Sequence, residues 1–139
     1  MLFRSQYWVR EVMNRMYKNH IRGLSGNDDC GQMSAWYLFT AMGFYPVCPG
    51  TDQYVLGAPY LPYLKMSLSN GKTFEIKAAG VSDKKRYVKS VRLNGKPYTK
   101  MYITHKDITE GGVLEFVMSA SPNKYRGQAK ADKPYSLSE

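Results

Sequence analysis

Two adjacent carboxylates, Asp28 and Asp29, lie in the part of this sequence best suited to chemistry. They stand in the run GNDDCGQ, residues 26–32, immediately before a predicted apolar helix. A carboxylate near a helix N-terminus is stabilised in its charged form by the helix dipole, by roughly 0.3–1 kcal/mol when exposed. Such a group can act as a general base toward water, bind a hard cation such as Ca²⁺, or simply cap free backbone N–H groups. The residues alone leave these three roles open.

Polar and aromatic side chains follow the two carboxylates. Gln32 and Ser34 could hydrogen-bond a substrate or cap the helix, and the usual preference for polar groups at helix starts favours capping. Trp36 and Tyr37 could stack on a sugar, but their place in the middle of the predicted helix favours packing in a core.

The cysteines and histidines show no pattern typical of a metal site. Cys30 and Cys48 have neither metal-ligand spacing nor a CxxC arrangement, so they could pair in an exported protein or remain buried thiols. His20 and His105 are isolated, and we interpret them as structural or surface residues. We expect no metal ligands in this chain.

Two helices are predicted in the first third of the chain. Residues 3–19 place Val9, Val12, Met13 and Met16 at helical spacing, which predicts a buried apolar stripe. Residues 29–42 are apolar on almost every side up to Gly43, a typical helix end. A helix of this kind needs partners all around it. The sequence therefore indicates a fragment of a larger protein or an obligate partner.

Beyond Gln53 the hydrophobic pattern changes to the alternation of strands. Asn70-Gly71 and Asn94-Gly95 predict two tight hairpin turns. The predicted strands cover residues 64–68, 74–78, 87–93, 98–103 and 113–118. The expected fold is α+β, with two helices (residues 1–50), an antiparallel sheet of five or six strands (51–122) and a frayed polar tail (123–139).

The net charge of +9 is concentrated in the second part of the chain, since residues 61–139 hold 15 of the 20 basic and 7 of the 11 acidic residues. A basic face can bind nucleic acid, but lysines also protect solvated sheet edges, and we favour that explanation. We expect no nucleic-acid partner. The chain has no apolar run long enough for a membrane span and no signal-peptide pattern at its start.

Residues 26–37 and 41–50 together resemble the signature near the C-terminal end of glycoside hydrolase family 92. The resemblance covers about residues 5–125 in order and at natural spacing. Further matching segments are residues 6–10, 52–59, 70–74, 93–98 and 105–108.

This resemblance implies an (α/α)₆ barrel whose late helices are residues 3–43, with the strands forming a small sheet against it. Family members remove terminal α-linked mannose, often α-1,2 or α-1,3, with inversion and with the help of Ca²⁺. Most of the calcium ligands and the catalytic glutamate are expected upstream, and Glu11 is expected to be a surface charge. The parent protein is expected outside the cytoplasm, where glycans are found.

The same resemblance assigns roles to the motif residues. Asp29 would be the general base, and Asp28 would orient the water or Asp29 itself. Asn27 and Gln32 would contact the mannose-containing glycan. Because the acid is elsewhere, the chain needs the remainder of the parent enzyme and is expected to be inactive alone. The alternative is a non-catalytic carbohydrate-binding or interaction module.

Overall fold

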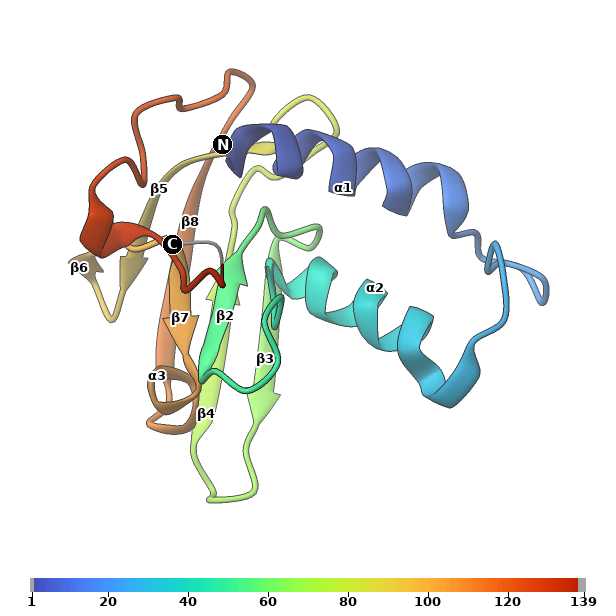
Figure 1. Cartoon of the computed structure of the whole chain (residues 1–139), viewed down its shortest axis with the longest axis horizontal. Helices are drawn as coiled ribbons and strands as arrows, with labels where there is room; N and C mark the ends of the chain where they lie inside the picture. The colour runs from blue at the N-terminus through green and yellow to red at the C-terminus, as the bar shows by residue number, and fades with distance from the viewer. Residues whose placement is uncertain (1, 138–139) are drawn as a thin grey trace.

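The computed structural model describes residues 2–137 and has the expected α+β fold, with two helices followed by two sheets (Figure 1). Helix α1 (Leu2–Met16) is followed by a 3-10 turn (Asp29–Gly31) that leads into helix α2 (Gln32–Met42). The described strands are β1 (Phe44–Tyr45), β2 (Gln53–Leu56), β3 (Tyr63–Ser67), β4 (Thr73–Lys77), β5 (Tyr87–Leu93), β6 (Lys96–Pro97), β7 (Tyr102–Thr104) and β8 (Gly112–Ser119). A short helix α3 (His105–Thr109) and a 3-10 turn (Lys130–Asp132) complete the described elements. None of the described helices combines the length and apolar character needed to cross a membrane.

The strands divide into two sheets, which differs in detail from the single antiparallel sheet that the sequence predicts. Strands β1, β2 and β7 form an antiparallel sheet. The other sheet has the order β3-β4-β8-β5-β6, and its β4–β8 pair is parallel. Turn residues specify only the pairing of strands that they join, so the insertion of β8 between the two hairpins is a non-local result.

Both predicted hairpin turns are confirmed, but the second hairpin is short. Asn94 and Gly95 have φ values of 51° and 77°, which the tight turn between β5 and β6 requires. After Pro97 the chain leaves this sheet, and β7 pairs with β2 in the other one. The Met101 carbonyl accepts a 2.8 Å hydrogen bond from the Leu56 N–H at this crossing.

The core lies between the two sheets. Phe44 and Leu56 come from one sheet, Phe74 and Leu114 from the other, and each is at most 2% exposed. Their contact in one buried cluster packs the sheets against each other. At about 25 cal/mol per Å² of apolar surface, this burial is the main stabilising contribution to the fold.

Helix α1 faces the sheet with polar side chains, so the predicted apolar stripe is partly wrong. Gln6, Arg10 and Met13 are its buried residues, whereas Met16 is 46% exposed. The side-chain Oε1 of Gln6 accepts a hydrogen bond from the Val88 N–H of β5 at 3.1 Å. The helix is rotated relative to the expectation because its sheet-facing side satisfies polar groups as well as apolar ones.

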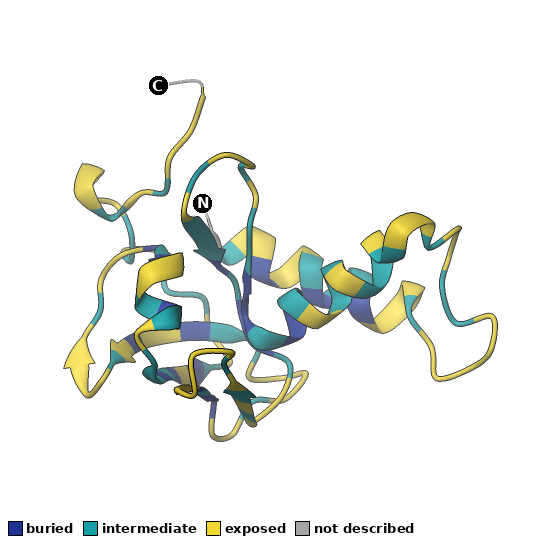
Figure 2. Cartoon of the chain, turned by 90° about the horizontal axis from the view of Figure 1, so that it is seen from below, coloured by how far each residue is buried: buried dark blue, intermediate teal, exposed yellow. Residues whose placement is uncertain are grey.

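Helix α2 has the opposite character, since it is apolar but poorly covered. Only Thr40 and Ala41 are buried in it, and Leu38 remains 62% exposed. Figure 2 shows exposed and half-buried positions along both helices where they project from the sheets. The expectation that this helix needs further partners is consistent with its exposure.

Candidate functional site

The turn before α2 has an unusual backbone. Cys30 and Gly31 are consecutive residues with positive φ, 54° and 72°. A left-handed conformation costs a non-glycine residue roughly 1–2 kcal/mol. These two left-handed residues reverse the chain within the 3-10 turn, directly before α2. The residues before them can therefore fold back beside the first turn of the helix.

Asp28 uses both of its carboxylate oxygens within this turn. One oxygen accepts the backbone N–H of Ser34 at 3.0 Å, and the other accepts the Ser34 hydroxyl. These two donors, the hydroxyl first, lower the pKa of Asp28 below its ordinary value. The Asp28 carboxylate thus satisfies a backbone N–H in the first turn of α2, whereas the Ser34 hydroxyl donates to a carboxylate and does not cap a backbone N–H as the sequence predicted.

Asp29 lies next to Asp28 in a different environment. Its side chain is exposed, as are those of Asn27 and Gln32 on the same turn. All of the sequence-predicted site residues are therefore together, with the Asp28 carboxylate bound internally and the Asp29 carboxylate open to solvent. An open carboxylate can accept a proton from a water molecule, which a carboxylate engaged by two donors does less readily.

A cluster of three aromatic side chains joins the segment after α1 to helix α2, next to this turn. The Tyr17 hydroxyl, just beyond α1, donates a 3.1 Å hydrogen bond to the Met33 carbonyl in the first turn of α2. The Tyr17 ring is stacked on Trp36, with centroids 5.6 Å apart, and contacts Tyr37 at 4.9 Å. Trp36 and Tyr37 therefore pack against Tyr17, but both are half-buried and lie outside the buried core cluster. Tyr17 was missed, because no spacing in the sequence predicts its contact with the next helix.

Glu11 is not the free surface charge that the sequence suggests. Its carboxylate forms ion pairs with Arg86 at 2.6 Å and with Arg15 at 2.7 Å, and its side chain is 15% exposed. The hydrogen bond from Arg86 lowers the pKa of Glu11. A general acid needs a raised pKa, so Glu11 is unsuited to protonate a leaving group.

Cys30 and Cys48 are free thiols, the first exposed and the second half-exposed. Among residues 2–137, no group of three or more His, Cys, Asp or Glu side chains could hold a metal ion.

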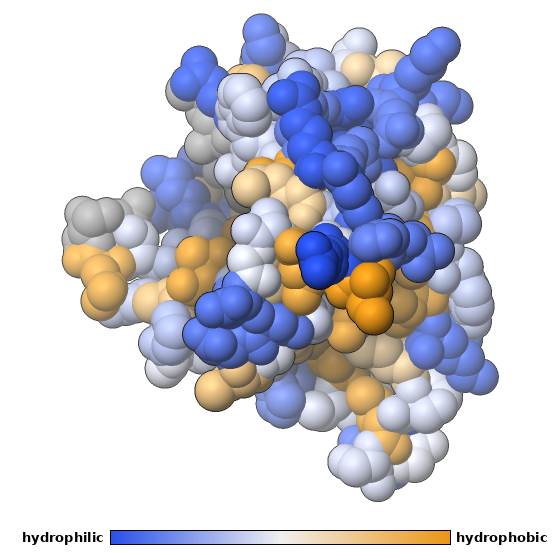
Figure 3. Space-filling view, turned by 90° about the vertical axis from the view of Figure 1, so that its right-hand side faces the viewer, coloured by the Kyte–Doolittle hydropathy of each residue, from blue (hydrophilic) through white to orange (hydrophobic). Residues whose placement is uncertain are grey.

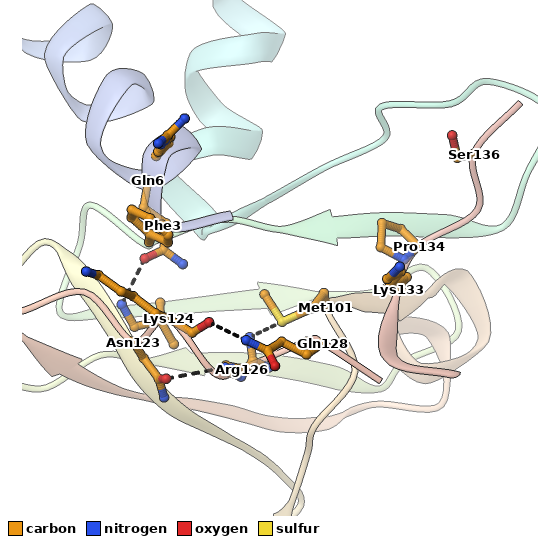
Figure 4. A pocket seen from close by; sticks show the side chains of 13 residues that line it. Phe3, Gln6, Met101, Asn123, Lys124, Arg126, Gln128, Lys133, Pro134 and Ser136 are labelled. Carbon is orange, nitrogen blue, oxygen red and sulfur yellow. Dashed lines mark hydrogen bonds between the residues drawn. The ribbon is translucent and has the colours of Figure 1, made fainter. Parts of the chain in front are cut away.

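A cavity whose lining includes none of the candidate turn is shown in Figure 4. It measures about 750 Å³ and separates the start of α1 from the C-terminal segment, with Phe3, Gln6 and Arg126 among its lining. The Arg126 guanidinium donates to the carbonyls of Tyr98 and Lys100 at 3.2 and 2.8 Å. Around Arg126, the predicted frayed tail is thus anchored to the loop between β6 and β7. None of the candidate site residues lines this cavity.

Comparison with known proteins places the turn in a family. Residues 3–120 match the glycosyl hydrolase family 92 catalytic domain. The chain belongs to glycoside hydrolase family 92. The matched range includes the turn, both helices and all eight described strands.

Several members of family 92 are similar to the chain in sequence and structure. The inverting mannosidase BT2199 of Bacteroides thetaiotaomicron aligns over 100% of the chain with 41% identity and a TM-score of 0.92. The α-mannosidase BT3965 of the same organism aligns over 98% with 45% identity and a TM-score of 0.92, and its complex with mannoimidazole aligns over 95% with a TM-score of 0.90. An uncharacterized secreted glycosidase of Arthroderma benhamiae is 31% identical over 83% of the chain. The chain spans 15–19% of the length of these relatives.

Proposed function

We propose that this chain supplies the general base of a longer enzyme that hydrolyses terminal α-linked mannose, of the α-1,2 or α-1,3 type, with inversion. The observation that carries the proposal is the exposed Asp29 carboxylate on a family 92 turn in which Asp28 is internally bound. The similarity to an inverting mannosidase supports both the substrate class and the stereochemistry.

The proposed reaction is a single displacement. The Asp29 carboxylate takes a proton from a water molecule whose oxygen bonds to the anomeric carbon. The bond from that carbon to the leaving oxygen breaks, and a carboxylic acid elsewhere in the enzyme protonates the leaving oxygen. Inversion places the two carboxyl groups roughly 6.5–9.5 Å apart, which leaves room for the water.

The neighbouring residues have supporting roles in this proposal. Asn27 and Gln32, exposed beside Asp29, would hydrogen-bond the sugar. Asp28 would orient Asp29 and its water through the turn. Calcium, which the family implies, would be held by other segments, because the described side chains form no cation cluster. The proposed task of this chain is therefore proton transfer and orientation.

The catalytic acid and further sugar contacts would come from the rest of a longer polypeptide. Trp8 on α1 and Leu38 on α2 are each 62% exposed. A groove of about 270 Å³ is lined by residues of both helices, among them Val9 and Trp36, and by Val47. Figure 3 shows apolar side chains among hydrophilic ones on the surface at the end where the helices project. Covering these side chains with further helices would bury the apolar surface. The secreted relative supports a location outside the cytoplasm for the parent enzyme.

The test is the replacement Asp29→Asn in the longer enzyme that contains this chain. We expect kcat on an aryl α-mannoside to fall by about 10²–10⁴-fold, the usual contribution of a general base. The matched control is Glu110→Gln, which neutralises an exposed carboxylate immediately after α3 and should leave kcat unchanged. Nuclear magnetic resonance of the wild-type reaction should show β-mannose as the first product. Full activity of Asp29→Asn, or α-mannose as the first product, would refute the proposal.

A further inference from the structure

Ser34 makes the side-chain hydrogen bonds that hold Asp28 in the candidate turn. Ser34 lies in the first turn of α2 and faces back to Asp28, six residues earlier. It gives its backbone N–H to one carboxylate oxygen of Asp28 and its hydroxyl to the other. A hydrogen bond to an ionised acceptor is roughly twice as strong as a neutral one. One residue therefore fixes both the position and the rotation of the Asp28 carboxylate.

The helix turn that carries Ser34 is itself held by Tyr17, the residue immediately after α1. Tyr17 donates its hydroxyl to the carbonyl of Met33, the residue before Ser34, at 3.1 Å. The Tyr17 ring is nearly parallel to that of Trp36, with an interplanar angle of 16°. The helix turn that carries Ser34 is therefore held by Tyr17, the residue that follows α1, as well as by its own helix.

Asp29 follows Asp28 directly in the chain, so the hydrogen bonds that hold Asp28 also restrict the backbone of Asp29. Beyond Asp29, the left-handed pair Cys30 and Gly31 leads directly into α2, and the Gly31 N–H donates to the Asp28 carbonyl at 2.9 Å. The Asp29 backbone is thus enclosed between an anchored carboxylate and a closed turn. Its exposed side chain projects from a backbone whose position is fixed on both sides.

We propose that Ser34 is a positioning residue for the catalytic base, acting through the Asp28 carboxylate, with Tyr17 as its support. The inference rests on the proposed role of Asp29 as the base. A base displaced by about 1 Å from its water loses on the order of 10²-fold in rate, although sugar binding is little changed. Ser34 should therefore affect kcat and leave KM largely alone.

The experiment compares variants in the longer enzyme that contains this chain. Ser34→Ala removes the hydroxyl and should lower kcat by roughly 10- to 100-fold with KM within about twofold of the wild type. Ser34→Thr keeps a hydroxyl and should recover most of this loss. Tyr17→Phe removes only the support to Met33 and should lower kcat by less than Ser34→Ala does. The matched control is Ser67→Ala, the same deletion at an exposed position in β3, which should leave kcat unchanged.

Each outcome has a definite meaning. A wild-type kcat for Ser34→Ala, when Asp29→Asn is inactive, would overturn the positioning role and leave the base assignment intact. A raised KM with unchanged kcat would make Ser34 a substrate contact and overturn the inference. Activity in Asp29→Asn would refute the base assignment itself. If Ser34→Ala fails to fold, Ser34→Cys offers a similar volume with a weaker donor, and wild-type kcat there would also overturn the inference.

Discussion

At the scale of single residues, the adjacent carboxylates Asp28 and Asp29 differ in chemistry because the backbone places them in different surroundings. Asp28 is bound by Ser34, whereas Asp29 remains exposed. Cys30 and Gly31 make this separation possible, since their positive φ values turn the chain between the carboxylates and α2. From the sequence, either carboxylate could have been the internal one.

The interaction of Asp28 with Ser34 predicts a pH-dependent contribution to stability. The pKa of Asp28 in the folded chain is below its ordinary value, so the unfolded state binds a proton first as the pH falls. The stabilisation is fully present above about pH 4 and is lost as the pH falls through the folded pKa. In Ser34→Ala, the carboxyl resonance of Asp28 should titrate at a higher pH than in the wild type.

Thermal unfolding of the chain checks the sign of this effect. Ser34→Ala should lower Tm at neutral pH, and the difference from the wild type should be smaller at acidic pH, because protonation of Asp28 removes the stabilisation that its lowered pKa represents. An equal difference at both pH values would mean that the Asp28 carboxylate is not the source. Ser67→Ala again serves as the hydroxyl-deletion control.

At the scale of elements, helix α1 is fixed to the sheets by buried polar contacts. The Arg10 side chain is 4% exposed, donates to the Pro59 carbonyl at 2.8 Å and stacks over the Tyr60 ring at 4.5 Å. Glu11 pairs with Arg86 on the loop before β5. These contacts set the position of α1, and with it the Tyr17 hydroxyl that supports the candidate turn.

Two arginines on α1 allow a matched test of this anchoring. Arg10→Ala should lower the free energy of unfolding by about 2–4 kcal/mol, because it removes a charge-assisted hydrogen bond and buried packing. Arg15→Ala removes a side chain that is 73% exposed and should cost less than about 1 kcal/mol. Urea unfolding of the two variants measures both values. Equal losses would contradict the anchoring role of Arg10.

At the scale of the whole molecule, the two halves differ in completeness. The sheets enclose a core in which Phe74 and Ile103 are 0% exposed, whereas Trp8 and Leu38 lie open on the helices. The base candidate Asp29 lies in the less covered half, at the start of the turn before α2. A site of this kind has its second carboxyl group and its walls on other segments, which is what the greater length of the relatives allows.

The isolated 139-residue chain should therefore give no measurable turnover of an aryl α-mannoside with Ca²⁺ present, because the acid partner is absent. The same assay with the longer enzyme should give inverting turnover. Clear inverting hydrolysis by the isolated chain would contradict this expectation. Mannose binding by the chain that survives Asp29→Ala would favour the non-catalytic binding module.

The sequence by itself determined the features that depend on neighbouring residues. The Asn70-Gly71 and Asn94-Gly95 turns, the apolar helix ending at Gly43 and the family motif around Asp29 were all readable because local backbone preferences and short spacing encode them. The α+β class followed from the change in hydrophobic period.

Only the tertiary structure decided which distant groups meet. The parallel β4–β8 pair, the hydrogen bond from Val88 to Gln6 and the contact of Tyr17 with Met33 join segments whose separation carries no local signal. Which of Asp28 and Asp29 is bound internally is a difference of the same kind. It depends on where the backbone reversal places each carboxylate relative to Ser34, and hydrogen bonding and burial, not residue type, determine which of them is bound and which is open.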